Sequence, residues 1–162
     1  MNIKKIYVAS PLGFSEAGRY FMDRKILPVL DELGYEIIDP WNLTPKELIQ
    51  PVMEQPFGSE KREKLRELNV VIGRNNTEAI KRSDGLFAVL DGTDVDSGTA
   101  SEIGYACGMD IPILGYRGDF RLSADNEGSE VNLQVEYFIR ASGGIIIKEI
   151  SELEDGMREV FG

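Results

Sequence analysis

The chain contains no histidine among its 162 residues. This absence excludes Ser-His-Asp and Cys-His catalytic machinery, and it excludes any zinc site with a histidine ligand. Acid, base or nucleophilic chemistry must therefore fall mainly to carboxylates, tyrosine or lysine. We expect no metal site and no cofactor.

Cysteine and long apolar runs are also scarce. The single Cys107 has no partner for an internal disulfide, and its apolar neighbours favour a packing role over a reactive thiol. No apolar run approaches the roughly 20 residues that a membrane helix needs, and the N-terminus leads into a short strand rather than a signal peptide. These features predict a cytoplasmic protein with no membrane partner.

Positively charged residues are fewer than negatively charged ones. The chain has 18 Lys and Arg against 28 Asp and Glu, a formal net charge of -10. No stripe of basic residues stands out, so a role that depends on neutralising phosphates is disfavoured and nucleic acid is not an expected partner. Neutral small molecules suit this chain better.

Strand and helix patterns alternate along the chain, as in proteins with a parallel sheet covered on both faces. The predicted strands are 3–9, 35–38, 85–90, 112–115 and 145–148. The predicted helices are 16–33, 59–68, 75–82, a helix from residue 99, 131–141 and 152–161, with a short helix at 45–50 inside the loop 39–58. We expect one α/β domain over residues 1–162 with a five-stranded parallel sheet.

The segment 91–108 is the most informative part of the chain. It joins the apolar strand 85–90 to a helix through a loop rich in carboxylates and glycines. Ligands of open α/β sheets bind at the carboxyl ends of the strands, where this loop lies. Glu102 has two interpretations here: it completes a capping box with Thr99, or it is an anionic nucleophile in the first helical turn, beside glycines such as Gly98 that let a substrate approach closely.

The carboxylates of this loop do not follow a known cation or phosphate pattern. Asp91, Asp94 and Asp96 fail the spacing of a calcium loop, and the glycines match neither the P-loop nor the dinucleotide fingerprint. Solvation or helix capping explains Asp91 and Asp94, whereas Asp96, closest to the helix start, remains a functional candidate.

Four residues elsewhere have both a structural and a functional interpretation. Tyr7 either packs in the core or, near the end of the first strand, extends its hydroxyl to a carboxylate. Trp41 either packs or forms a stacking platform for a planar ring. Asn76 and Asn132 each lie at the expected start of a helix, where a capping role is common.

Four separated segments together resemble the nucleoside 2-deoxyribosyltransferases. They are Ile6-Tyr-Val-Ala-Ser-Pro-Leu12, Asn76 upstream of Ala79-Ile-Lys-Arg-Ser-Asp84, Asp96-Ser-Gly-Thr-Ala-Ser-Glu-Ile-Gly-Tyr-Ala106, and Val131-Asn-Leu133. The resemblance implies a flavodoxin-like, doubly wound sheet. It also implies an enzyme of nucleoside salvage that exchanges the base of a 2'-deoxynucleoside through a covalent deoxyribosyl-enzyme intermediate.

The resemblance assigns roles to residues of this chain. Glu102 would attack C1', Tyr7 would hold its carboxylate, and Asp96 would contact the base and assist its proton transfer. Other residues would bind the 2'-deoxynucleoside or free base: Ser10, Trp41, Asn76, Gly98, Asn132 and Gln134. Asn132 would come from a neighbouring subunit to bind the 5'-hydroxyl, which implies a homo-oligomer with shared sites.

Two positions depart from the pattern of the family. Asn76 stands where some members have Asp, so a hydrogen bond to the ligand is expected there rather than proton donation. Gln134 stands where many members carry Met.

Two other functions remain open. Related hydrolases cleave 2'-deoxynucleoside 5'-monophosphates, but their Gly-Ser-x-Arg-Gly-Gly phosphate loop is replaced here by residues 10–18, which contain no Arg and favour an unphosphorylated nucleoside. A non-catalytic nucleoside sensor is the third possibility. The choice between purines alone and both kinds of base stays open, because the loop 39–58 matches poorly.

Overall fold

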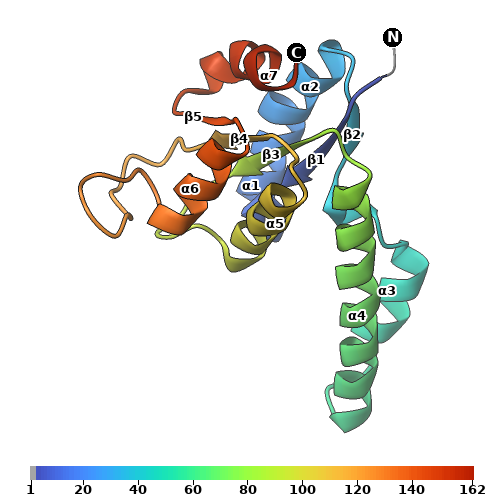
Figure 1. Ribbon diagram of the computed structural model, residues 1–162. Helices are drawn as coiled ribbons and strands as arrows, with labels where there is room; N and C mark the ends of the chain where they lie inside the picture. Colours follow the sequence, from blue (N-terminus) through green and yellow to red (C-terminus); the bar gives the residue numbers. More distant parts are fainter. Residues whose placement is uncertain (1–2) are drawn as a thin grey trace.

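A computed structural model describes residues 3–162 and contains a five-stranded, all-parallel sheet with helices on both faces (Figure 1). The strands are β1 (Lys5–Ala9), β2 (Glu36–Ile38), β3 (Gly85–Val89), β4 (Ile113–Tyr116) and β5 (Ile145–Ile147). Their order in the sheet is β2-β1-β3-β4-β5, the flavodoxin-like order. The predicted α/β class and five parallel strands are confirmed.

Two layers of helices cover the sheet. The longer helices are α1 (Glu16–Phe21), α2 (Leu27–Glu32), α3 (Lys46–Met53), α4 (Ser59–Lys81), α5 (Ser97–Gly108), α6 (Leu133–Ala141) and α7 (Leu153–Phe161). One apolar cluster joins the sheet to α5, α6 and the end of α4, and a second joins it to α1, α2 and α7. Successive strand residues alternate between them, so Tyr7 and Ala9 belong to the first cluster and Ile6 and Val8 to the second.

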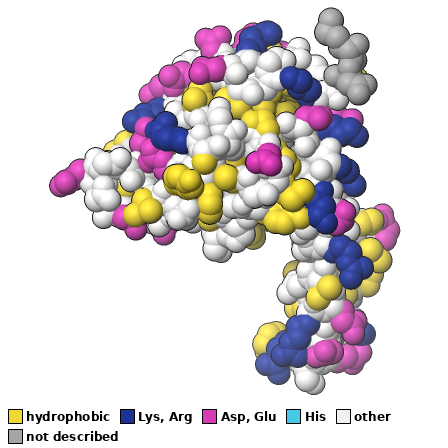
Figure 2. Space-filling model, viewed as in Figure 1, with side chains coloured by type: hydrophobic (Ala, Val, Ile, Leu, Met, Phe, Trp, Pro, Cys, Tyr) yellow, Lys and Arg dark blue, Asp and Glu magenta, His cyan; other side chains and the backbone are white. Residues whose placement is uncertain are grey.

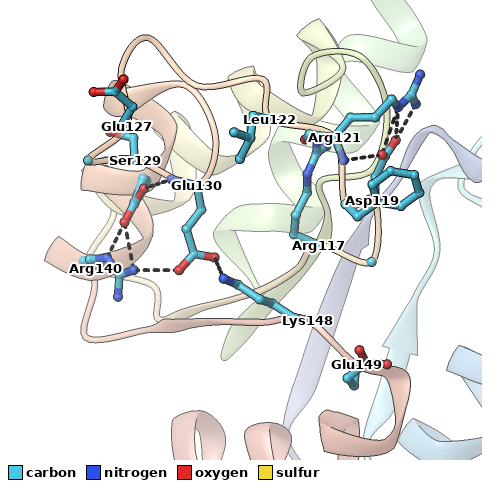
Figure 3. A pocket seen from close by; sticks show the side chains of 14 residues that line it. Arg117, Asp119, Arg121, Leu122, Glu127, Ser129, Glu130, Arg140, Lys148 and Glu149 are labelled. Carbon is cyan, nitrogen blue, oxygen red and sulfur yellow. Dashed lines mark hydrogen bonds and ion pairs between the residues drawn. The ribbon is translucent and has the colours of Figure 1, made fainter.

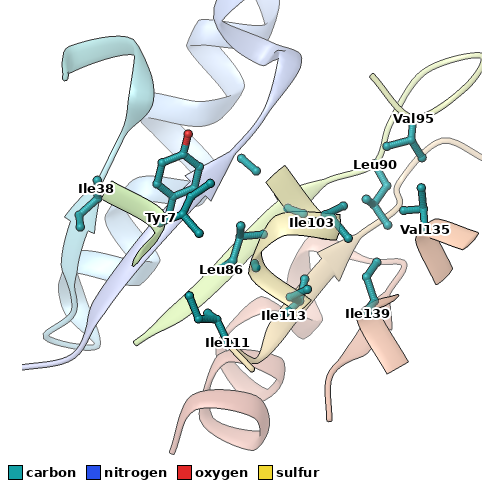
Figure 4. Packing of buried hydrophobic residues seen from close by; sticks show 14 of the residues in the cluster. Tyr7, Ile38, Leu86, Leu90, Val95, Ile103, Ile111, Ile113, Val135 and Ile139 are labelled. Carbon is teal, nitrogen blue, oxygen red and sulfur yellow. The ribbon is translucent and has the colours of Figure 1, made fainter. Parts of the chain in front are cut away.

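The first cluster contains one polar group of special interest. Figure 4 shows the Tyr7 ring among apolar side chains, with its hydroxyl oxygen pointing away from the cluster. The ring lies in a fully buried position on β1. A buried tyrosine hydroxyl needs a hydrogen-bond partner, which the next subsection identifies.

Two helices differ from their predicted forms. The helix 16–33 is interrupted by a π-helical segment, Met22–Ile26, because Pro28 in the following turn lacks an N–H for the regular ladder. The prediction of separate helices at 59–68 and 75–82 is wrong, since α4 runs without a break for 23 residues. It includes Gly73 and three asparagines, which lower helix propensity, but tertiary packing outweighs that preference.

Helices α3 and α4 form an arm that projects from the body of the protein (Figure 1). The two helices pack against each other, and the amide of Asn75 on α4 donates to Thr44 Oγ1, 3.1 Å away, at the base of α3. Helix α4 also contacts α5, and its Ala79 and Ile80 join the first apolar cluster against the sheet.

Candidate active site

The start of α5 carries the first two carboxylates of the site. Asp96 is the N-cap: its Oδ2 accepts hydrogen bonds from the backbone N–H groups of Gly98 (3.0 Å) and Thr99 (3.1 Å). Of the two interpretations of Glu102, the capping box with Thr99 is therefore excluded, because the helix begins at Ser97 and Asp96 caps it. Capping by Asp96 leaves the Glu102 side chain free for another partner.

That partner is Tyr7. Its hydroxyl donates a hydrogen bond of 2.5 Å to Oε1 of Glu102, across 95 positions of sequence. The two meet because β1 pairs with β3 in parallel, with Tyr7 opposite Leu86, and α5 returns over the same face of the sheet. The order of the strands reverses between β1 and β3, and crevices at such reversals are where this class of fold binds ligands.

The environment of Glu102 disfavours its charge. The pKa of this carboxyl is raised from 4.5 to about 6, chiefly because the group is buried; the hydrogen bond from Tyr7 lowers it, and the charge of Asp96 raises it. Burial and the charge of Glu102 raise the pKa of Tyr7 far above its usual range. Tyr7 therefore remains a donor to a carboxylate that is ionised at neutral pH.

Asp96 and Glu102 border a cavity of about 410 Å³, which we call the α5 cavity; Tyr7 lies behind Glu102 and does not line it. Its polar lining residues are Ser10, Asn69, Asn76, Asp96, Thr99 and Glu102. Its other lining residues are Phe14, Pro40, Trp41, Ile72 and Gly98. Among residues 3–162, the charged groups that line it are carboxylates alone, so the cavity offers no cation for a phosphate.

One wall of the α5 cavity is aromatic. Trp41 donates from Nε1 to the carbonyl oxygen of Ser10 (3.3 Å), and the rings of Trp41 and Phe14 form a T-shaped pair with 4.7 Å between centroids. Gly13 is needed for this contact, because a Cβ there would overlap the Trp41 ring. The loop after β1 therefore holds the indole in place beside the cavity.

Most of the chain matches one known protein family. The family model described as nucleoside 2-deoxyribosyltransferase matches residues 6–134. The chain belongs to this family. A search of curated protein sequences finds no match for this chain.

Solved structures support the same assignment to the nucleoside 2-deoxyribosyltransferase family. The chain is 26% identical to a 2-deoxyribosyltransferase from Bacillus psychrosaccharolyticus, covering 93% of this chain and 90% of that one, with a TM-score of 0.64. A conserved protein from Enterococcus faecalis V583 is 24% identical over 98% and 99%, with a TM-score of 0.69. A CMP N-glycosidase from Clostridium botulinum shares the fold at 19% identity, over 96% of both chains, with a TM-score of 0.55.

The α5 cavity of this family member includes five residues that the sequence analysis did not assign to the site. They are Phe14, Pro40, Asn69, Ile72 and Thr99. Asn69 and Ile72 lie in the stretch that was predicted to separate two helices. Had α4 been recognised as continuous, the spacing of Asn69, Ile72 and Asn76 would have placed all three on one helix face.

Asn132 and Gln134 do not reach the α5 cavity of their own chain. Asn132 is the N-cap of α6, and its Oδ1 accepts from the backbone N–H groups of Gln134 (3.1 Å) and Val135 (3.4 Å). On this helix Val135 is buried, whereas Leu133 and Tyr137 are 48% and 63% exposed. The apolar residues of α6 therefore do not all pack on their own sheet.

A second cavity, of about 500 Å³, lies between residues 117–130, α6 and the end of β5; we call it the loop cavity (Figure 3). Several of its charged groups pair with one another. Arg140 binds Glu136 (2.8 Å) and Glu130 (3.6 Å), and Lys148 approaches the other oxygen of Glu130 (3.6 Å).

Arg117 and Asp91 secure the same loop to the sheet. Arg117 is buried and donates from Nη1 to the carbonyl oxygens of Leu90 and Gly92. Asp91 Oδ1 accepts the backbone N–H of Asp119 at 2.8 Å. Asp91 therefore holds this loop in place, rather than serving the solvation or helix-capping role that was expected of it.

The described residues form neither a cluster of metal-ligand side chains nor a helix suited to crossing a membrane. Within residues 3–162, no group of three or more His, Cys, Asp or Glu side chains is placed to hold a metal ion. No helix in the same range combines the length and the apolar content that crossing a membrane requires.

Proposed function

We propose that this protein transfers the 2-deoxyribosyl group between nucleobases in nucleoside salvage. In the first step a carboxylate oxygen of Glu102 bonds to C1' of a 2'-deoxynucleoside while the bond from C1' to the base breaks, and the base leaves with the bonding electrons. In the second step a nitrogen of another base attacks C1' and Glu102 departs as a carboxylate. Two displacements at one carbon retain its configuration.

The contact between Tyr7 and Glu102 carries this proposal. A 2.5 Å hydrogen bond fixes one carboxylate oxygen and leaves the other to act as the nucleophile. Tyr7 also lowers the pKa of Glu102, which keeps the carboxylate ionised at neutral pH despite its burial. Oδ2 of Asp96 accepts the N-cap bonds, so Oδ1 is available to contact the base and assist its proton transfer.

The lining of the α5 cavity favours an unphosphorylated nucleoside. A 5'-phosphate would meet the carboxylates of Asp96 and Glu102 without a compensating Lys or Arg among the lining residues of the described chain. Trp41 offers an apolar surface for a planar base, and Ser10 and Gly98 line the same cavity. This charge distribution disfavours a monophosphate hydrolase.

We also propose that the active unit is a homo-oligomer with shared sites. Asn132 and Gln134 would enter the α5 cavity of a second copy, where Asn132 would bind the 5'-hydroxyl. The exposed Leu133 and Tyr137 beside them supply apolar surface for such a contact. Figure 2 shows hydrophobic side chains intermixed with acidic and basic ones on the projecting arm, a second surface that a partner copy could cover.

Incubation with 2'-deoxyinosine and free adenine or cytosine tests the reaction, with every product followed by chromatography. A new deoxynucleoside demonstrates transfer. Free hypoxanthine alone would show hydrolysis instead, and bound but unchanged deoxyinosine would show a sensor. Either of these two results contradicts the transferase proposal.

Complementation tests the shared site. Glu102→Ala and Asn132→Ala variants, each inactive alone, are mixed under conditions that exchange subunits. If sites are shared, some mixed sites regain both residues and turnover returns. Absence of turnover together with a monomeric mass in light scattering would leave Asn132 as a helix cap only.

A further inference from the structure

The indole of Trp41 separates two cavities. On one side lies the α5 cavity, and on the other lies a smaller cavity of about 170 Å³, which we call the back cavity. The lining of the back cavity includes Gly13, Arg19, Asp23 and Asp39. Among the residues that the structure describes, Trp41 alone lines both cavities, so a contact made in the back cavity reaches a ligand in the α5 cavity through this ring.

Arg19 approaches the indole from the back cavity. Its Cζ lies over the Trp41 ring, 5.6 Å from the centroid, and its Nε–H donates to the carbonyl oxygen of Gly13 at 3.0 Å. The backbone of Gly13 packs against the same ring, because a Cβ built there would overlap the indole. Arg19 therefore makes a cation–π contact with the indole and also holds the backbone against which the indole packs.

The hydrogen bonds of Trp41 fix its edge and its backbone rather than the face of its ring. Nε1 donates to the carbonyl oxygen of Ser10 (3.3 Å), and the backbone N–H donates to Oδ1 of Asp39 (3.0 Å). A hydrogen bond at the edge of a ring still allows the ring to tilt about that edge. The guanidinium of Arg19 over the face opposes this tilt, and it does so from the back cavity, which leaves the α5 cavity free for a base.

The charge of Arg19 stays on its own side of the indole. Burial raises the pKa of Asp39, and the positive charge of Arg19 partly offsets that rise. The guanidinium thus has carboxylates as neighbours in the back cavity, and it is not among the residues that line the α5 cavity. Arg19 can therefore support the aromatic wall without offering a cation to a phosphate.

We infer that Arg19 is a positioning residue for the base, because it holds the Trp41 indole at the angle at which the indole stacks on a planar ring. This inference rests on the proposed transferase function, in which a base binds beside Trp41. A wall that is already held in its bound orientation loses less conformational freedom when the ligand arrives. Stacking contributes equally before and during cleavage of the bond to C1', so loss of Arg19 should raise KM and leave kcat nearly unchanged.

The test uses Trp41 as its own reporter. It is the only tryptophan of the chain, so tryptophan fluorescence reports on this side chain alone. Arg19→Met removes the charge and keeps an unbranched side chain. With adenine as the acceptor, the KM for 2'-deoxyinosine should rise about three- to tenfold and kcat should stay within about twofold, because a cation–π contact and a hydrogen bond are lost. Acrylamide should quench the fluorescence of Arg19→Met more strongly than that of the wild type.

Matched variants separate this effect from a general loss of charge. Arg24→Met removes an exposed cation from the next helical segment and should leave both KM and the quenching unchanged. Gly13→Ala is the positive control, because its Cβ displaces the indole directly. An Arg19→Met protein with the wild-type KM, with a lowered kcat or with wild-type quenching overturns the inference.

A failure of the proposed function would look different. If the wild type exchanges no base, the transferase proposal is overturned. The Kd for 2'-deoxyinosine, followed by the quenching of Trp41 in the wild type and in Arg19→Met, then decides the role of Arg19. Equal Kd values, or no quenching by 2'-deoxyinosine, would overturn the inference as well.

Discussion

The α5 cavity and the loop cavity have comparable volumes, about 410 and 500 Å³, and both contain carboxylates. In the loop cavity Glu130 and Glu136 have Arg140 or Lys148 within 4 Å, so charge is neutralised locally and helps to hold residues 117–130. In the α5 cavity, Glu102 is half-buried with a neutral hydroxyl as its hydrogen-bond partner.

The difference shows where the protein accepts an unfavourable electrostatic arrangement. Forming an ion pair costs little free energy at a partly exposed site. Burying a carboxylate without a neighbouring cation raises the pKa of that carboxyl and lowers the stability of the fold. Such arrangements concentrate at functional sites, because the strained group gains reactivity. Four substitutions test this contrast between the two cavities.

The largest effect is expected for Glu102→Ala. Removal of the nucleophile should lower base exchange by on the order of a thousandfold or more, because no other carboxylate occupies its position against Tyr7. Exchange is measured by chromatography and folding by circular dichroism. Ser101→Ala, on the exposed side of the same helix, is the matched control, and a folded Glu102→Ala protein with full activity would exclude the covalent mechanism.

Tyr7→Phe should have the next largest effect. Loss of a hydrogen bond to a charged group is worth about 1.5–3 kcal/mol, or roughly 10- to 100-fold in rate at neutral pH. Because Tyr7 lowers the pKa of Glu102, its removal should also move the acidic limb of the pH–rate profile upward from the wild-type position near 6. A profile that keeps its limb would show that Tyr7 does not act on the carboxylate.

Glu102→Gln should stabilise the protein while it removes activity. The folded-state pKa of Glu102, about 6, lies above its ordinary value of 4.5, so its contribution to stability is greatest below pH 4.5 and is lost as pH rises through 6. Glutamine keeps an acceptor for Tyr7 without the charge. We expect a gain of about 2 kcal/mol in the free energy of unfolding at pH 8, measured by urea denaturation.

The pH dependence supplies the check on that gain. The advantage of Glu102→Gln over the wild type should disappear at pH 4, where the wild-type carboxyl is protonated in the folded state. An equal advantage at both pH values would mean that packing, rather than charge, causes the difference.

The smallest effect is expected in the loop cavity. Lys148→Ala removes the ion pair between Lys148 and Glu130. Because the lysine side chain is 65% exposed, the free energy of unfolding should fall by about 1 kcal/mol or less. Base exchange should stay at the wild-type rate in the same assay. A clear loss of exchange would show that the loop cavity takes part in the reaction.

Much of the fold could be predicted because it depends on local pattern. Short β-branched runs alternating with amphipathic helices indicate a parallel sheet, and all five strands lie where that alternation placed them, within one or two residues at most boundaries. The wrong prediction of a break in α4 has the same origin, because it too was made from local pattern. Gly73 and its polar neighbours weaken local helix propensity, and only packing against α3 and α5 reveals that the helix continues.

For the site, the residue types that can act follow from the sequence alone. Without histidine, and with carboxylates at the exit of β3, the candidates were Asp96 and Glu102, and the family motif added Tyr7. The tertiary structure alone decided their relations: Asp96 caps α5, Glu102 turns to Tyr7, and the α4 amides face the cavity. These contacts depend on strand register and helix phase, which join residues up to 95 positions apart and leave no trace in local periodicity.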